Sequence, residues 1–248
     1  MMDTPLTLDF FFRRAESLFP HKELITATAT GIERSNYGQW ADRTRRLGGA
    51  LNDLGIKESG RVGTFAWNTA RHLELYFAVP CSNRVLHTLN IRLFADQIVY
   101  IANHAEDEVI FVDRSLMALL WPLVDQLETV RHFVVMDDGD GEIPDDPRVI
   151  DYEELIAAAP AVDFEVRDEK QAASMCYTSG TTGNPKGVVY SHRSTYMHTI
   201  TTMTTDGLGV CESDVILPVV PMFHVNSWGL QHAAVAAGAT LVNPGPKL

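Results

Sequence analysis

The hydrophobic pattern of the chain begins with two amphipathic helices. The first is predicted from apolar residues at helical spacing that stop before Pro20, namely Leu8, Phe11, Phe12, Ala15 and Leu18. The second ends at Gly55 and has its apolar face at Trp40, Thr44, Leu47, Leu51 and Leu54. We expect both apolar faces to pack in a core, and Arg43, Arg45 and Arg46 to form the solvated side of the second helix.

Short apolar runs and helical patterns then alternate along the chain. Strands are predicted over residues 62–67, 85–89, 109–112 and 132–136, and helices over residues 70–79, 95–103 and 116–127. Such alternation is typical of βαβ units, which build a parallel sheet covered by helices. The pattern therefore predicts an α/β fold of layered, mostly parallel sheets flanked by helices.

The pattern is weaker after residue 136. The acidic run 137–142 lacks the spacing and the terminal glutamate of an EF-hand, which favours a solvated surface loop over a calcium site. Residues 157–168 form a connector, and we place a boundary there, between a first α/β subdomain (1–168) and an incomplete second one (169–248). In the latter, a strand interrupted by Pro218 is expected over 215–220, a helix over 229–237 and another strand over 240–242.

Composition limits the class of protein. With 248 residues, 46% of them hydrophobic, the chain can form one large α/β domain or two smaller ones. Its net charge of −12 argues against binding nucleic acid. It shows no membrane-spanning run and no secretory signal, which predicts a cytoplasmic protein. The three distant cysteines, Cys81, Cys176 and Cys211, suggest neither a disulfide framework nor a zinc site.

Glycines, hydroxyl residues and a lysine are concentrated in Tyr177–Gly187. This segment reads YTSGTTGNPKG and follows an apolar run at 172–176. Glycines let the backbone bring N–H groups close to an anion, hydroxyls add donors, and Lys186 supplies a mobile positive charge. This composition predicts a phosphate-binding loop and hence an enzyme that uses a nucleotide.

The loop does not have Walker A spacing. Gly180 and Gly183 are only three residues apart, and Gly187 rather than a hydroxyl residue follows Lys186. Residues 188–190 are predicted to form a second strand, and Ser191 is predicted to cap a helix after it. The expected order is therefore strand, loop, strand, helix.

Tyr177–Gly187 resembles the signature loop of the adenylate-forming superfamily, which contains acyl-CoA synthetases, nonribosomal adenylation domains and luciferases. In that family the loop embraces the β- and γ-phosphates of ATP while a carboxylate attacks the α-phosphorus. The resemblance implies catalytic roles for Lys186 and Thr182, and nucleotide contacts from Thr178, Ser179, Gly180, Thr181, Thr182, Gly183 and Lys186. It also implies Mg²⁺, although its usual acidic ligand lies beyond this chain, so the metal ligand is unknown.

A second motif, Pro221–Gly229, reads PMFHVNSWG. By itself, a histidine beside a phenylalanine is more often a hydrogen-bonded core residue than a catalytic one. The resemblance instead implies that His224 orients the carboxylate substrate or stabilises charge at the α-phosphate. It places Phe223 in the pocket wall, with Asn226 and Trp228 in the same substrate pocket.

Within the superfamily, residues 222–228 with 245–246, and residues 87–93, are most similar to medium- and long-chain fatty acyl-CoA synthetases. In some of those enzymes a tryptophan that matches Trp228 closes the mouth of an acyl tunnel, whereas a packed core tryptophan is the alternative interpretation. Residues 81–84, CSNR, depart from the usual Gly-x-Gly-Ala pattern of this subgroup. The departure predicts a reshaped or strained turn.

The resemblance covers the whole chain but only the first half of a family member, so we expect a partial large N-terminal domain without the C-terminal domain. It implies a fatty-acid–CoA ligase that uses ATP and coenzyme A, inactive as this fragment alone. The alternatives are an acyl-AMP ligase that delivers to a carrier protein, and a non-catalytic nucleotide- or acyl-binding fragment. Peripheral membrane contact and a homodimer are compatible with the resemblance.

Overall fold

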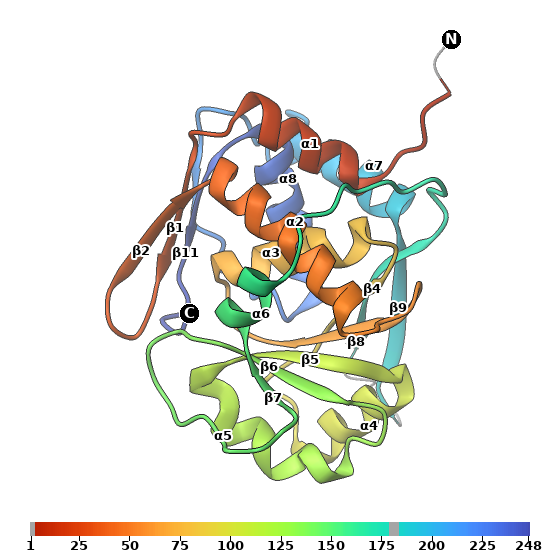
Figure 1. Cartoon of the computed structure of the whole chain (residues 1–248). Helices are drawn as coiled ribbons and strands as arrows, with labels where there is room; N and C mark the ends of the chain where they lie inside the picture. The colour runs from red at the N-terminus through yellow and green to blue at the C-terminus, as the bar shows by residue number, and fades with distance from the viewer. Residues whose placement is uncertain (1–2, 179–183) are drawn as a thin grey trace.

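The structure, a computed structural model that describes residues 3–178 and 184–248, contains two sheets with helices packed against them (Figure 1). The order of the larger sheet is β7 (Val149–Asp151), β6 (His132–Met136), β5 (Asp107–Asp113), β3 (Arg61–Phe65), β4 (Val85–Thr88), β8 (Ala172–Thr178) and β9 (Lys186–Ser191). The order of the smaller sheet is β10 (Val215–Ile216), β11 (Thr240–Asn243), β1 (Glu23–Ala27) and β2 (Ile32–Asn36).

Neighbouring strands are parallel except for two antiparallel pairs, β8 with β9 and β1 with β2. The α/β fold of layered, mostly parallel sheets flanked by helices is confirmed. The boundary predicted near residue 168 lies between β7 and β8, which belong to the same sheet. The division into two subdomains stays a prediction.

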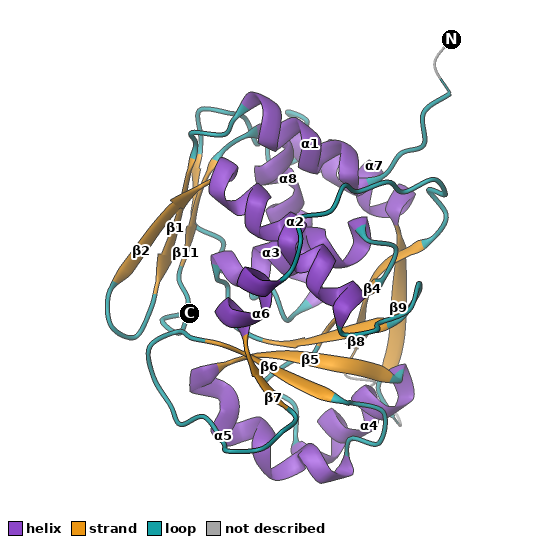
Figure 2. Cartoon of the chain, in the orientation of Figure 1, coloured by secondary structure: helices purple, strands orange, loops and turns teal. Residues whose placement is uncertain are grey.

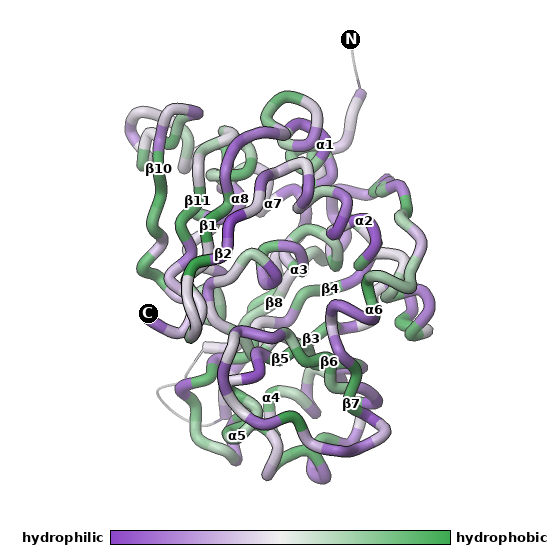
Figure 3. Tube along the Cα trace, turned by 60° about the vertical axis from the view of Figure 1, so that its left-hand side comes forward, coloured by the Kyte–Doolittle hydropathy of each residue, from purple (hydrophilic) through white to green (hydrophobic). Residues whose placement is uncertain are grey.

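Helices cover both faces of the larger sheet (Figure 2). One group lies on the side of the smaller sheet: α1 (Leu8–Leu18), α2 (Tyr37–Asp53), α3 (Ala70–Cys81), α6 (Tyr152–Ala158), α7 (His192–Met203) and α8 (Leu230–Ala237). On the other face lie α4 (Ala95–Ala105) and α5 (Met117–Leu120). The coloured trace shows apolar residues along β6, an interior strand of the larger sheet (Figure 3).

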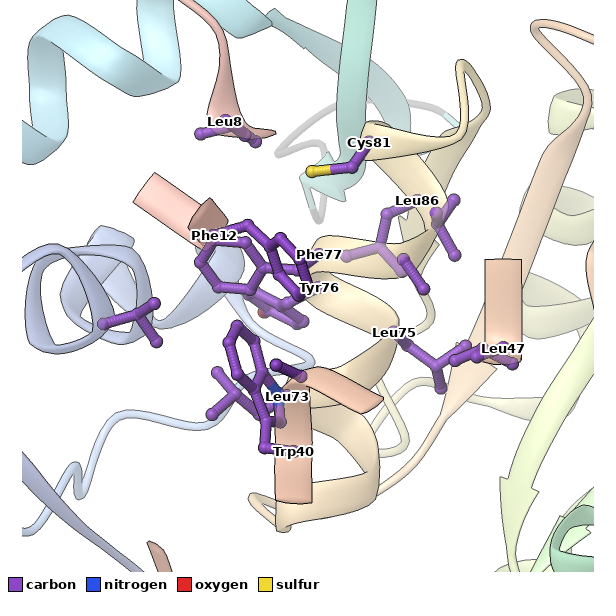
Figure 4. Packing of buried hydrophobic residues seen from close by; sticks show 14 of the residues in the cluster. Leu8, Phe12, Trp40, Leu47, Leu73, Leu75, Tyr76, Phe77, Cys81 and Leu86 are labelled. Carbon is purple, nitrogen blue, oxygen red and sulfur yellow. The ribbon is translucent and has the colours of Figure 1, made fainter. Parts of the chain in front are cut away.

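The core between the two sheets is built around the helices predicted first (Figure 4). Phe12 of α1 and Phe77 of α3 each place their ring centroid 5.2 Å from that of Trp40 on α2. Aromatic pairs in such tilted and edge-on arrangements stabilise a fold beyond the area they bury. The core packing predicted for the first two helices is confirmed, although Leu18 is exposed rather than packed.

Two predicted elements are shorter than expected, and each contains a proline. Residues 116–127 do not form one α-helix. The short helix α5 is flanked by two 3-10 segments, Arg114–Leu116 and Trp121–Gln126. Pro122 lies in the first turn of the second segment and has no N–H to continue the α-helical hydrogen bonds of α5. The strand predicted over 215–220 stops at Ile216, two residues before Pro218. By contrast, Pro80 is accepted inside the last turn of α3.

The structure also contains elements that the hydrophobic pattern did not reveal, namely β1, β2, β7 and α6. Strands β2 and β7 are short and have no buried residue, so they show no apolar alternation. The helix α6 has a readable signal, since Asp151 caps it by accepting a hydrogen bond from the Glu154 N–H.

The acidic run 137–142 is not a fully solvated loop. Asp138 is buried, and its carboxylate accepts hydrogen bonds from the backbone N–H and the hydroxyl of Ser115. Its carbonyl oxygen accepts a further bond from the Ala29 N–H, next to β1. The loop therefore ties the smaller sheet to the segment after β5.

The turn at residues 81–84 adopts a left-handed conformation at Asn83, with φ of 62°. Asparagine tolerates this region better than most residues, so a glycine is not required there. The neighbouring Arg84 is buried and donates hydrogen bonds to the Ile56 carbonyl and the Asn52 side chain. The departure from the glycine pattern thus produces a turn closed by its own polar side chains.

The arginines of α2 are not a uniformly solvated side, which corrects the prediction. Arg43 forms ion pairs at 2.6 Å with Glu74 of α3 and at 2.7 Å with Glu153 of α6. Arg45 pairs at 2.8 Å with Glu16 of α1. Arg46 forms an ion pair with Asp42 on its own helix and donates a hydrogen bond to the Ala159 carbonyl. Neighbouring helices cover the first two arginines, and only Arg46 matches the expectation.

Replacing Arg43 with methionine is expected to destabilise the chain strongly. Glu74 is almost fully buried, and burial raises its pKa while Arg43 opposes that rise. Removing one partner of a buried ion pair leaves an uncompensated charge, which costs roughly 3–5 kcal/mol. Urea unfolding measures the change in the free energy of unfolding.

The matched control is Arg46→Met, because Arg46 lies one turn further along α2 and forms an exposed pair that contributes no more than about 0.5 kcal/mol. The double variant with Glu74→Gln should recover part of the stability lost in Arg43→Met. Equal losses in Arg43→Met and Arg46→Met would contradict the role given to the buried pair.

Candidate functional site

The predicted phosphate loop lies in the sequence between β8 and β9, which form an antiparallel pair. Tyr177 faces Gly187 and Thr178 faces Lys186 across this pair, so the predicted succession of two strands and a helix is confirmed. Ser191 caps α7 as predicted, since its hydroxyl accepts a hydrogen bond from the Ser194 N–H. Five predicted contact residues lie outside the described residues: Ser179, Gly180, Thr181, Thr182 and Gly183.

The described ends of the loop suit an anionic ligand. Lys186 is exposed at the start of β9, and the Thr178 hydroxyl lies 3.5 Å from its carbonyl oxygen. A hydroxyl residue and a lysine thus stand at the two described ends of the loop. The catalytic and nucleotide-binding roles predicted for the loop residues stay predictions.

The base of the loop is anchored by residues that the sequence analysis missed. The Tyr177 hydroxyl and His104 Nδ1, at the end of α4, share a hydrogen bond of 2.6 Å. A Cβ atom at Gly187 would lie 3.2 Å from the Tyr177 ring, so the glycine lets the ring pack against β9. Burial raises the pKa of Tyr177 to about 12, which keeps its hydroxyl protonated.

A buried His87–Asp107 pair lies next to Tyr177. The Nδ1–H of His87 donates to the Asp107 carboxylate at 2.8 Å, and the His87 ring centroid lies 5.2 Å from that of Tyr177. Burial raises the pKa of Asp107, and the neighbouring His87 opposes that rise. A polar histidine within the apolar strand 85–89 was the available signal for this pair.

The second motif is held in place from its first residues. The Met222 N–H donates to the Asn68 side chain at 2.6 Å, and its carbonyl oxygen accepts from the Tyr76 hydroxyl at 2.6 Å. Phe223 is buried and packs edge-on against Trp67, with ring centroids 6.2 Å apart. His224 is exposed to solvent. The structure thus separates these two predicted pocket residues, one into the core and one onto the surface.

The backbone after His224 forms a left-handed turn. Residues Val225, Asn226, Ser227 and Trp228 have φ between 47° and 53°, and Gly229 has φ of 70°. For residues other than glycine this region costs about 1–2 kcal/mol each. Such strained conformations persist only where surrounding contacts hold them, and they concentrate at functional sites.

Hydrogen bonds from four neighbouring segments hold the strained turn. The Asn226 side chain accepts from the Thr88 hydroxyl at 2.9 Å and donates to the Ser174 hydroxyl at 3.2 Å. The Ser227 hydroxyl donates to the Val220 carbonyl at 2.8 Å. His198 Nε2 of α7 bonds to the carbonyl of residue 228 at 2.9 Å.

The turn directs Trp228 into solvent, where 62% of its surface is exposed. The interpretation of Trp228 as a packed core residue is therefore wrong. Gly229 has a steric role, because a Cβ atom there would lie 2.5 Å from the His198 ring. The close approach brings the turn against α7.

A cavity of about 340 Å³ lies between β8, β9, α7, α8 and the strained turn. Its wall includes Asn226 and Trp228, which are two of the predicted pocket residues. It also includes Tyr190, Val225 and the buried His232. Phe223 and His224 do not border the cavity. Because β8 and β9 form one of its walls, the cavity shares the hairpin that carries the phosphate loop.

Within the described residues, no group of three His, Cys, Asp or Glu side chains could hold a metal ion. All three cysteines are free thiols. Among the described helices, none has both the length and the apolar character needed to cross a membrane.

Comparison with known proteins identifies close relatives. Residues 12–247 match the family described as AMP-binding enzyme. Over its whole length the chain is 44% identical to the 3-methylmercaptopropionyl-CoA ligase of Ruegeria lacuscaerulensis, of which it covers 47%. It is 47% identical to the long-chain-fatty-acid–CoA ligase of Thermus thermophilus and 42% identical to the medium-chain-fatty-acid–CoA ligase of Ectopseudomonas oleovorans, of which it covers 45% and 46%.

Solved structures share the fold. The anthranilate CoA ligase AuaEII in complex with anthranoyl-AMP matches 98% of the chain with a TM-score of 0.84 at 22% identity, over 46% of its own length. The long-chain-fatty-acid-CoA ligase FadD1 from Archaeoglobus fulgidus matches 98% of the chain with a TM-score of 0.83 at 23% identity, over 48% of its own length. The chain spans about half the length of the relatives it matches.

Replacing Val225 with glycine is expected to raise the free energy of unfolding by up to about 1 kcal/mol. The change removes about 1–2 kcal/mol of left-handed strain, and the extra freedom of glycine offsets about 0.5–1 kcal/mol of that gain. Val225 is 37% exposed, so the loss of its remaining packing offsets a further part of the gain. Urea unfolding of the chain measures the difference.

The control is Val219→Gly, since Val219 is exposed and is absent from the described residues with positive φ. That variant should lose about 0.5–1 kcal/mol. A comparable loss in Val225→Gly would show that the turn carries no strain at this position.

Proposed function

Since the chain belongs to the AMP-binding enzyme family, we propose that it is the first half of a fatty-acid–CoA ligase. The proposed reaction joins a medium- or long-chain fatty acid to coenzyme A with ATP. The observation that carries the proposal is that one hairpin, β8 with β9, supplies both the base of the phosphate loop and a wall of the cavity. An acyl chain in the cavity and a triphosphate at the loop would therefore meet at this hairpin.

The proposed chemistry has two steps. A carboxylate oxygen of the fatty acid attacks the α-phosphorus of ATP, and the bond to the bridging oxygen breaks, so that acyl-AMP forms and pyrophosphate leaves. The sulfur of coenzyme A then attacks the acyl carbon, the bond to AMP breaks, and the thioester forms with loss of the thiol proton. Both steps need charge stabilisation at phosphate oxygens.

Charge stabilisation is the part assigned to the loop. Lys186 and the Thr178 hydroxyl offset charge that develops on the leaving pyrophosphate, together with the proposed donors Ser179, Thr181 and Thr182. His224 is proposed to orient the carboxylate, which its exposed position at the start of the strained turn allows. Mg²⁺ would accompany ATP and add positive charge, but the described residues suggest no protein ligand for it.

Binding of the acyl chain is assigned to the cavity. Each methylene group that leaves water contributes about 0.8 kcal/mol to binding. A longer alkyl chain that fills the cavity of about 340 Å³ therefore binds more tightly than a short one. Trp228 projects from the strained turn at the edge of the cavity, which suits a gate at its mouth. A cytoplasmic location, a homodimer and peripheral membrane contact remain proposals.

The Lys186→Ala variant of the intact ligase is expected to release pyrophosphate about 100-fold more slowly, because one charged donor to the leaving group is lost. The assay follows pyrophosphate with ATP and a panel of medium and long fatty acids. Lys170→Ala is the matched control, since Lys170 is an exposed lysine just before β8, at the opposite end of that strand from the loop. If no acid in the panel stimulates pyrophosphate release, the ligase assignment fails.

The same assay separates the acceptors. With coenzyme A present, the acyl thioester should accumulate, whereas a carrier protein should not replace it. Transfer to the carrier protein alone would instead identify an acyl-AMP ligase. Binding of ATP or acid without any pyrophosphate release would indicate a non-catalytic protein.

Trp228→Ala is expected to change the preference for chain length while KM for ATP stays within about twofold, since the side chain borders the cavity assigned to the acyl chain. The measurement compares kcat/KM for fatty acids of increasing length. Leu119→Ala, at an exposed position on α5 beyond the other face of the larger sheet, provides the control. An unchanged length profile in Trp228→Ala would refute the gate.

A further inference from the structure

The strained turn is held differently at its two ends. Asn226 and Ser227 are buried, and their side chains bond to buried or half-buried groups inside the fold. Trp228 is exposed, and its backbone carbonyl lies 2.9 Å from Nε2 of the exposed His198 on α7. The end of the turn that carries the tryptophan is therefore held from the solvent side.

The chemistry of this contact fixes which atom is the donor. A carbonyl oxygen can only accept a hydrogen bond, so Nε2 of His198 carries the proton. The neutral ring with its proton on Nε2 meets this condition, and so does the imidazolium. The hydrogen bond to the Trp228 carbonyl is thus compatible with either charge state of His198.

The ring of His198 also lies against the backbone of the turn. A Cβ atom at Gly229 would lie 2.5 Å from Cδ2 and 2.9 Å from Nε2 of this ring. Glycine allows the close approach, and it also adopts the φ of 70° at this position without steric cost. The residue after Trp228 therefore has the shape that admits the histidine, which distinguishes the contact from an incidental hydrogen bond at the surface.

His198 and Trp228 belong to the same cavity wall. Both line the cavity of about 340 Å³, together with Val225 and Asn226 of the turn. The hydrogen bond thus forms at the edge of the cavity that is assigned to the acyl chain. A contact that fixes the backbone of Trp228 at this edge also fixes the point from which its side chain projects.

The hydrogen bond is strong enough to decide the conformation of residue 228. Trp228 has φ of 53°, a left-handed conformation that is unfavourable for a residue with a Cβ atom. The net stabilisation from one hydrogen bond is of the same order as this conformational cost. Loss of His198 removes the contribution that offsets the strain. Trp228 then gains access to right-handed and extended conformations, in which its side chain points elsewhere.

We propose that His198 is a positioning residue, which holds the backbone of Trp228 so that the indole stands at the mouth of the acyl cavity. It sets the preference of the ligase for the length of the fatty acid through Trp228, without contact to the reacting atoms. The inference rests on the proposed ligase function and on the assignment of Trp228 as the gate of the cavity.

The test compares the chain-length preference of variants of the intact ligase. The measured quantity is the ratio of kcat/KM for dodecanoate to kcat/KM for octanoate, from acid-dependent pyrophosphate release. His198→Ala should change this ratio by about fivefold, in the same direction as Trp228→Ala, since the loss of one hydrogen bond has an effect of that order. KM for ATP should stay within about twofold, because the change acts on the acyl cavity.

Two amide variants separate the hydrogen bond from a general effect of the histidine. His198→Gln should keep the ratio of the unmodified protein, because its amide nitrogen can donate from the position of Nε2. His198→Asn carries the same amide on a side chain that is one methylene shorter, so it should behave like His198→Ala. Met197→Ala is the control and should leave the ratio unchanged, since Met197 is the neighbouring exposed residue of α7 and does not border the cavity.

The double variant of His198→Ala with Trp228→Ala tests whether the histidine acts through the tryptophan. In that case the ratio in the double variant equals the ratio in Trp228→Ala alone, because the group that His198 positions is already gone. A ratio that combines the two single changes would show independent effects. It would mean that His198 acts on the acyl chain directly, and the positioning role would be overturned.

The remaining outcomes separate this inference from the proposed function. If no acid stimulates pyrophosphate release, the ligase proposal fails, and the positioning role fails with it. If the acids are activated but the ratio is the same in His198→Ala and the unmodified protein, the positioning role is overturned while the ligase proposal stands. An unchanged ratio in Trp228→Ala, or a ratio in His198→Gln as altered as that in His198→Ala, would overturn it equally.

Discussion

The pairing of β8 with its two neighbours is the constraint on which the rest of the site depends. A parallel ladder to β4 fixes β8 inside the larger sheet, and an antiparallel ladder to β9 returns the chain beside it. Met175 and Tyr177 pack toward the face opposite the core between the sheets, as expected for two residues that are two positions apart on a strand. Ala173 instead packs into that core, because the register of the strand shifts between Ala172 and Ser174. The strand therefore reaches the phosphate loop already fixed on both sides, and Ser174 is left to line the cavity.

The strained turn after His224 depends on that frame. Its left-handed residues are held by hydrogen bonds to β4, β8, α7 and the segment before the turn, so the strain is distributed over contacts that exist only in the folded chain. The same contacts place an exposed tryptophan and an asparagine at one cavity. The hydrogen bonds that hold this short turn thus also fix the position of one edge of the cavity.

Most of the secondary structure of the larger sheet could be predicted from the sequence, because the strands β3, β4, β5, β6 and β8 are largely buried and read as apolar runs. The failures have local causes: Pro122 interrupts a helix whose apolar spacing continues, and β2 has no apolar alternation because no residue of it is buried. The site was predicted in part. Asn226 and Trp228 border the cavity, while His198, His104 and the His87–Asp107 pair were missed because their roles depend on residues distant in the chain.

The sequence by itself determined the fold class, the phosphate-loop hairpin and the family. Hydrophobic periodicity and motif spacing carry this information because both depend only on residues that are close together in the sequence. It also determined that a histidine and a tryptophan follow in one motif. Only the tertiary structure decided that Phe223 enters the core, that Trp228 faces solvent and that Arg43 is covered by two other helices. These outcomes depend on which elements pack together, and burial and hydrogen-bond partners arise from that packing rather than from neighbours in sequence.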